Sequence, residues 1–167
     1  VASFDSTAPL MRAFKDKDKN YYLGARTFSA IRVPQVDGNP KLKRRILSGE
    51  VDPERARILQ RRVLRLLVEY EAEESDLDTT VSAVVEYESL FNPKSDRESV
   101  YRQVLLERPW EQCDCEICRG IGIHVIIFRG AERNRRRGFH NLHQFYRSLG
   151  EAIDSTHDAT STSLRSA

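Results

Sequence analysis

Cys113-Asp114-Cys115-Glu116-Ile117-Cys118 gathers every cysteine of the chain into six residues. An odd and crowded set of this kind suits metal ligation better than a disulfide framework. Two histidines follow, His140 and His143, and either one completes a closed tetrahedral zinc site with the three thiolates. Because four protein ligands leave no open position for an activated water, we predict a structural Zn²⁺. The alternative is three buried or free cysteines without a metal.

Length and composition set further limits. The 167 residues can bury one ordinary core but are short for a complete eight-stranded α/β barrel, which needs about 250 residues. The chain opens on Val1-Ala2-Ser3-Phe4 without a starting methionine, so we expect a region upstream of it. Reduced cysteines and the lack of any apolar run of about 18 residues predict a cytoplasmic protein with no membrane span.

Local charge clusters, rather than the net charge of +2, carry any case for a nucleic-acid partner. Basic residues gather in residues 41–45 and again in Arg133-Asn134-Arg135-Arg136-Arg137. Guanidinium groups pair with phosphate oxygens, so the candidate phosphate-binding residues are Arg133, Arg135, Arg136 and Arg137. A solvated surface loop explains the same run equally well.

The pattern of apolar residues divides the chain into segments. The first 50 residues read as irregular, although we assign residues 1–51 to a barrel segment, and residues 52–108 read as a helical module. Its three helices are expected from Asp52, from about residue 77 to 91, and from a capping box at residues 95–98. Residues 109–156 hold the cysteine run, a buried parallel-type strand at 121–128 and a helix from about residue 141. That helix should bury one apolar face, formed by Leu142, Phe145, Tyr146, Leu149 and Ile153. Residues 157–167 read as a frayed tail.

The metal motif resembles that of the queuine and archaeosine tRNA-guanine transglycosylases. Their zinc site is a C-x-C-x-x-C run followed by a histidine in an H-N dipeptide, and Cys113, Cys115, Cys118 and His140-Asn141 match that order. An adjacent aromatic pair follows in that family, and Phe145-Tyr146 supplies one. His143 gives a cysteine-to-histidine gap closer to the usual one but lacks the following asparagine, so both histidines stay open as the fourth ligand.

A second motif lies near the beginning of the chain. Phe4-Asp5-Ser6-Thr7-Ala8-Pro9 is similar to the F-D-x-x-x-P segment in which these enzymes carry their nucleophilic aspartate, at the end of a barrel strand. The resemblance implies that Asp5 attacks the sugar and that Arg12, close to the position of the family's arginine, contacts nucleic acid. It also places the general acid and base upstream of Val1, so the chain alone should be inactive.

The connection between Asp5 and Cys113 is much longer than in the tRNA enzymes and contains the whole helical module. This insertion, together with the run at residues 129–141, looks more like the branch that inserts 7-deazaguanines into DNA. The resemblance implies an α/β fold: the C-terminal portion of a (β/α)8 barrel, with a zinc-binding subdomain and a helical insertion. It implies guanine exchange for a 7-deazaguanine base in nucleic acid, in DNA in preference to tRNA. The alternative hypothesis is a non-catalytic, zinc-stabilised nucleic-acid-binding module. The sequence does not predict the oligomeric state.

Overall fold

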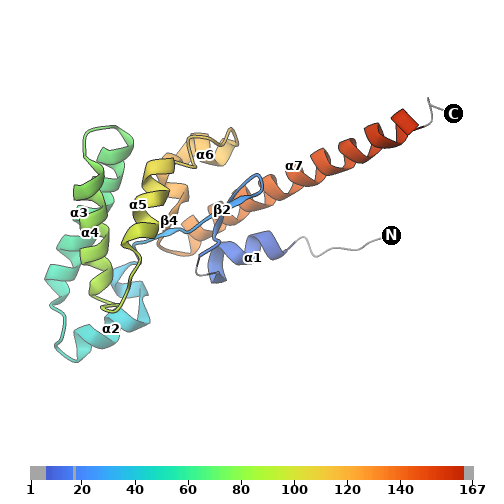
Figure 1. The fold of residues 1–167 in the computed structure, drawn as a ribbon. Helices are drawn as coiled ribbons and strands as arrows, with labels where there is room; N and C mark the ends of the chain where they lie inside the picture. The colour runs from blue at the N-terminus through green and yellow to red at the C-terminus, as the bar shows by residue number, and fades with distance from the viewer. Residues whose placement is uncertain (1–6, 17, 164–167) are drawn as a thin grey trace.

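The computed structural model describes residues 7–16 and 18–163, as a helical body from which one long helix projects (Figure 1). The helices are α1 (Ala8–Lys15), α2 (Pro40–Leu47), α3 (Pro53–Glu71), α4 (Leu77–Ser89), α5 (Glu98–Glu107), α6 (Glu116–Ile121) and α7 (Ala131–Ser163). Strand β1 (Tyr21–Leu23) pairs antiparallel with β2 (Arg26–Phe28), and β3 (Ile31–Arg32) pairs parallel with β4 (Ile127–Phe128). Two short 3₁₀ helices, η1 (Val36–Gly38) and η2 (Gly122–Val125), complete the set. The described residues are therefore mostly helical with few strands, and no barrel can be traced among them.

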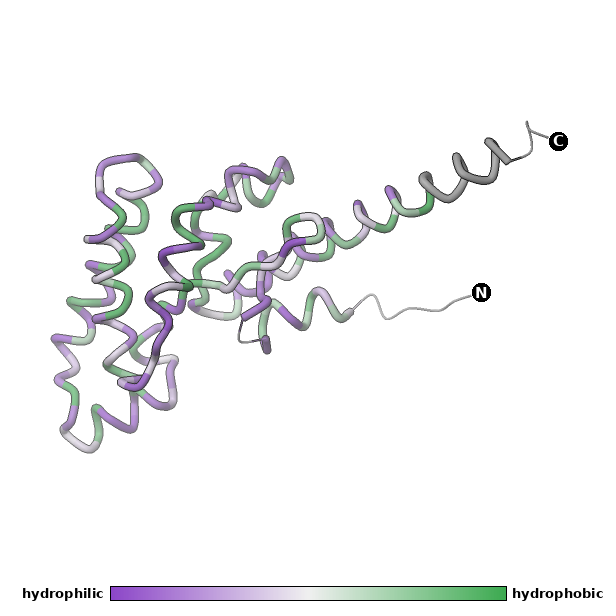
Figure 2. Tube along the Cα trace, in the orientation of Figure 1, coloured by the Kyte–Doolittle hydropathy of each residue, from purple (hydrophilic) through white to green (hydrophobic). Residues whose placement is uncertain are grey.

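The helical module expected at residues 52–108 contains α3, α4 and α5, which pack side by side in chain order. The carboxylate of Asp52 caps α3 by accepting from the amides of Glu54 and Arg55, and Pro53 occupies the first helical position. Figure 2 shows apolar and polar residues alternating along these helices, as expected for helices with one buried face. Their buried side chains share one core with β1 and the three cysteines, so the module is not a separate packing unit.

Helix α5 begins later than predicted. Its N-terminal boundary is Arg97, without a side-chain cap, so the capping box at Ser95 is wrong. The amide of Ser95 instead donates to the carbonyl of Asn92 at 3.0 Å, which makes Ser95 part of the turn that follows Pro93.

The expectation of an irregular first segment is also wrong. Helix α1, the β1–β2 hairpin and helix α2 all lie within residues 1–51. Asn39 caps α2, with its side-chain oxygen accepting from the amides of Lys41 and Leu42 at 2.9 and 3.0 Å. Asn39 as the cap and Pro40 at the first position are therefore the start signals of a short helix.

Only the end of the apolar run at residues 121–128 is a strand. Residues Ile127–Phe128 pair in parallel with Ile31–Arg32, but residues 122–125 form η2. Gly122 has a φ of 51°, and an added Cβ would lie 2.2 Å from Oε1 of Glu71. The chain therefore turns at Gly122, and its apolar side chains are buried without an extended backbone.

Helix α7 begins well before residue 141 and buries a polar face. Its buried side chains are Asn134, Arg137, His140, Asn141 and Gln144, whereas Tyr146 and Ile153 of the predicted apolar face are about half exposed. Gly138 lets α1 approach closely, since a Cβ there would lie 2.6 Å from Cδ1 of Leu10. The helix continues to Ser163, through most of the predicted frayed tail, because adding a residue to a formed helix costs little. No described helix combines the length and apolarity that a membrane crossing requires.

Candidate metal centre

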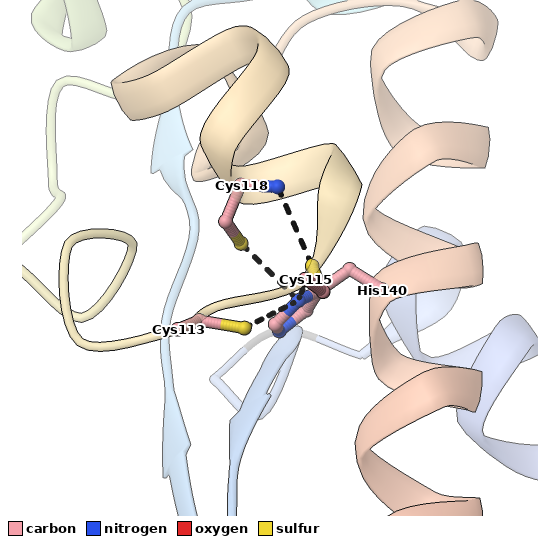
Figure 3. A group of neighbouring side chains, drawn as sticks. All are labelled: Cys113, Cys115, Cys118 and His140. Carbon is pink, nitrogen blue, oxygen red and sulfur yellow. Dashed lines mark hydrogen bonds between the residues drawn. The ribbon is translucent and has the colours of Figure 1, made fainter.

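The four predicted ligands come from three elements that meet in the core (Figure 3). Cys113 lies in the loop after α5, while Cys115 caps the N-terminus of α6 and Cys118 lies in its first turn. The thiol of Cys115 accepts from the amide of Cys118 at 3.4 Å, which holds both sulfurs on one side of the helix. His140 reaches them from α7. All four side chains are buried.

The spacing of the donor atoms fits zinc. Nδ1 of His140 lies 3.6, 3.4 and 3.3 Å from the Sγ atoms of Cys113, Cys115 and Cys118. The donor atoms all lie within 4.8 Å of one another. A tetrahedron with Zn–S bonds of about 2.3 Å and a Zn–N bond of about 2.0 Å has S···N edges of about 3.5 Å. The cluster can therefore bind Zn²⁺ with little rearrangement, and four protein donors leave no position for a reactive water.

The structure brings His140, and not His143, to the three thiols. His143 lies on the exposed side of α7 and lines a surface cavity with Asp114, Glu116 and Arg147. Of the two histidines that the sequence left open, His140 has the position of a ligand. It is also the one in the H-N dipeptide.

Two tyrosines orient the imidazole. Nε2 of His140 lies 2.7 Å from the carbonyl oxygen of Tyr22, and donation to that carbonyl leaves the Nδ1 lone pair facing the thiols. The ring of Tyr21 stacks on the imidazole, with centroids 4.0 Å apart and planes 14° apart. Sequence reasoning missed both residues, because nothing in the spacing of β1 relates it to a histidine more than 100 residues later.

Gln144 supports the opposite side of the centre. Its Nε2 donates to Sγ of Cys113 at 3.1 Å, and its Oε1 accepts from the amide of Gly24 at 3.1 Å. A hydrogen bond donated to a ligating sulfur holds that sulfur in position and stabilises its negative charge. The signal for Gln144 was its position four residues after His140, on the same face of a helix.

The electrostatics of the cluster favour a thiolate at Cys115 beside a protonated His140, so metal binding must release the His140 proton. Burial opposes ionisation of Cys115, but hydrogen bonds from His140 and from the amide of Cys118 lower its pKa to about 6. Burial lowers the pKa of His140, yet its hydrogen bonds to the three cysteines outweigh this and raise it to about 11. Burial raises the pKa of Cys118. The centre thus stabilises a thiolate at Cys115, and thiolates are the ligands that zinc requires.

Asn141 connects the metal centre to the beginning of the chain. Its Nδ2 donates to the carbonyls of Pro9 and Asn20 at 3.2 and 2.7 Å, and its Oδ1 accepts from the amide of Tyr22 at 3.0 Å. The H-N dipeptide therefore binds one short segment with both side chains. Asp5, the predicted nucleophile, lies outside the described residues, four positions before Pro9.

The run of arginines at residues 133–137 lies in the first part of α7. Arg137 is fully buried, and its guanidinium donates to the carbonyls of Ala13, Val125 and Ile127 and to Oδ1 of Asn134. Although its Nε has no partner among the described residues, the side chain is enclosed by protein and out of reach of a phosphate, so the prediction that Arg137 binds nucleic acid does not fit this structure.

The other predicted phosphate contacts are accessible. Arg135 and Arg136 are exposed and Arg133 is half-buried, and Arg135 forms an ion pair with Glu132 at 3.0 Å. Arg12 is exposed on α1 and donates to the hydroxyl of Tyr22 at 3.0 Å.

A search of protein-family models finds no match for this chain. The chain is 48% identical over 153 residues to a DNA-guanine transglycosylase of Salmonella montevideo. The aligned region takes in 89% of this chain and 37% of that protein, so the chain spans little more than a third of its relative's length. The chain is thus similar over most of its length to one part of a DNA-guanine transglycosylase, and it contains the buried Cys3His cluster that the sequence motif predicted.

Proposed function

We propose that this chain is the C-terminal, zinc-binding part of an enzyme that exchanges guanine in DNA for a 7-deazaguanine base. The observation that carries the proposal is the 48% identity to a DNA-guanine transglycosylase over nearly the whole chain. The relative's name supports DNA in preference to tRNA. In the complete protein, the N-terminal segment of this chain would contribute to a (β/α)8 barrel.

Base exchange is a substitution at the anomeric carbon of the sugar. In the proposed reaction, a carboxylate oxygen of Asp5 attacks C1′ as the bond to N9 of guanine breaks. Guanine leaves with the bonding electrons and takes a proton from a general acid elsewhere in the protein. The incoming base then loses a proton, attacks C1′ and releases Asp5, so two inversions give retention. Within a duplex the target nucleotide must first leave the stack.

The metal centre has a structural part in this proposal. Bound zinc would link α6 to α7, and Asn141 would then hold the carbonyl of Pro9 beside it. The backbone that follows the F-D-x-x-x-P motif is thereby tied to a rigid centre. Positioning a nucleophile in this way lowers the cost of reaching the reactive geometry.

Nucleic-acid binding is proposed for Arg12, Arg133, Arg135 and Arg136, through phosphate contacts that carry no sequence information. The three arginines of α7 lie within one turn, and Arg135 and Arg136 are exposed. Buried Arg137 is left out of this set.

The test is Asp5→Asn in the complete protein, with the exposed Asp37→Asn as a matched control. Asn keeps the size of the side chain but removes the attacking charge, so exchange of labelled guanine should stop while DNA binding survives. Denaturing gels should show a DNA adduct with the parent protein and the Asp37 variant only. Full exchange by Asp5→Asn, with deamidation excluded by mass spectrometry, would move the nucleophile elsewhere. DNA binding without exchange in the parent protein would favour a non-catalytic module.

A further inference from the structure

A basic surface cavity lies where the end of α3 meets α6, η2 and α7. Its volume is about 520 Å³, and its charged lining residues are Arg119, Arg133, Arg136 and Glu71, with His124 beside them. Arg119 and His124 come from the zinc-binding segment, whereas Glu71 is the last residue of α3. We call this site the Arg119–Arg136 pocket.

The arginines of the pocket have no anionic partner among the residues that the structure describes. None of the three forms an ion pair with a described carboxylate, although the neighbouring Arg135 does so with Glu132. The carboxylate of Glu71 is already used, because its Oε1 accepts from the amide of Ile123 at 2.7 Å. Three guanidinium groups thus face one carboxylate that a backbone amide already engages.

Two nitrogens in the pocket lining lack hydrogen-bond partners. Nη1 of Arg133 and Nδ1 of His124 are both buried, and neither has a partner within the described part of the chain. Burial lowers the pKa of Arg133, and the nearby charges of Arg129 and Arg136 lower it further. A guanidinium stays charged even with a lowered pKa, so Arg129, Arg133 and Arg136 repel one another, and no described anion offsets this repulsion. A tetrahedral anion would supply acceptors to the nitrogens and offset the repulsion.

We propose that the Arg119–Arg136 pocket binds one backbone phosphate of the DNA substrate. The proposal rests on the proposed function and extends it to Arg119 and His124, which no sequence motif marked. The cavity is far larger than a phosphate group, and Arg119 and Arg136 are exposed at its edge, so a phosphate attached to a sugar on each side can enter. Since Glu71 forms part of the lining, the end of the helical insertion helps to shape a DNA contact.

The test replaces the three arginines together, as Arg119→Gln, Arg133→Gln and Arg136→Gln, in the complete zinc-loaded protein. Binding to a fluorescent DNA duplex is measured by anisotropy at several salt concentrations. Affinity should fall roughly tenfold or more for every duplex sequence, and the slope of log K against log salt should lose about one unit. The matched control removes the same charge from α3, where Arg57, Arg61 and Arg65 pair with glutamates. It should change affinity less than about twofold.

Equal losses in the two triple variants would assign the effect to net charge and overturn the proposal, as would an unchanged salt slope. If the triple variant loses zinc or unfolds, the exposed pair Arg119→Gln and Arg136→Gln is measured instead, with the same expected direction. Inorganic phosphate serves as a second probe: if it stabilises the parent protein but not the variant while DNA affinity stays equal, the pocket binds a free anion and the proposal fails.

Guanine exchange is assayed in parallel. If the parent protein shows no exchange but the triple variant still binds DNA more weakly than the parent, only the proposed function is rejected. If the parent exchanges guanine and the triple variant binds DNA as tightly as the parent, only the pocket is rejected.

Discussion

Asn141→Ala should destabilise the chain much more than an ordinary polar-to-alanine change. Asn141 is fully buried and binds the carbonyls of Pro9 and Asn20 and the amide of Tyr22. Its removal takes a hydrogen-bond partner from two buried carbonyls and from the part-buried amide of Tyr22, and each loss costs about 1 kcal/mol. The free energy of unfolding should therefore fall by about 3 kcal/mol, which lowers Tm by roughly 6–12 °C for a chain of this size.

The assay is urea unfolding of the zinc-loaded chain, followed by circular dichroism and by fluorescence to check that the two transitions coincide. The exposed Gln103→Ala, which removes one amide contact to Glu107, should cost less than about 0.5 kcal/mol. Asn141→Leu distinguishes lost packing from lost hydrogen bonds, because leucine fills the volume of the asparagine side chain without restoring any hydrogen bond. A loss below about 1 kcal/mol in Asn141→Ala, or full recovery in Asn141→Leu, would refute the assignment of the effect to unpaired polar groups.

Three further predictions concern neighbouring residues. His140→Ala should abolish the roughly one zinc per chain that His143→Ala retains, as measured by metal analysis, and the reverse result would reassign the fourth ligand. Arg137→Ala should lower the free energy of unfolding by about 3 kcal/mol, because buried carbonyls lose their donor, while DNA affinity of the folded protein stays the same. A DNA defect without a stability loss would return Arg137 to the phosphate-binding set. Gly122→Ala should cost about 1–3 kcal/mol through its positive φ and the contact with Glu71, and a neutral effect in thermal unfolding would contradict this.

The sequence predicted those elements whose local signals agree with one another. Asp52 and Pro53 mark the start of α3, and apolar residues then recur at helical spacing, so cap and periodicity gave the same answer. The strand at residues 121–128 was mispredicted because an apolar run shows burial but not backbone conformation. The chain turns at Gly122 with a positive φ and close to Glu71, a contact between distant segments that an apolar run does not reveal.

The metal ligands were predictable because chemistry restricts them to a few residue types at short spacing. Their surroundings were not, since Tyr21 and Tyr22 reach His140 only through the packing of β1 on α7. The same packing explains the error at Arg137. A run of arginines indicates a solvated or phosphate-binding segment, and it gives no sign that one member lies under α1 and binds carbonyls.

The polar face of α7 shows how a short chain can hold distant segments in register. Apolar contacts would allow α1 and β1 to slide along the helix, but Asn141 and His140 each accept or donate at fixed backbone groups. Such hydrogen bonds fix the position of α1 and β1 along α7 more than they raise the free energy of unfolding, because each contributes only about 1 kcal/mol net. A structural zinc contributes about 10–16 kcal/mol in small zinc domains, so metal binding can hold the ligands in place while the amides set the register. Chelation should then release the Pro9 segment before it unfolds α3 and α4, because Asn141 binds that segment next to a ligand, whereas α3 and α4 contribute no ligand.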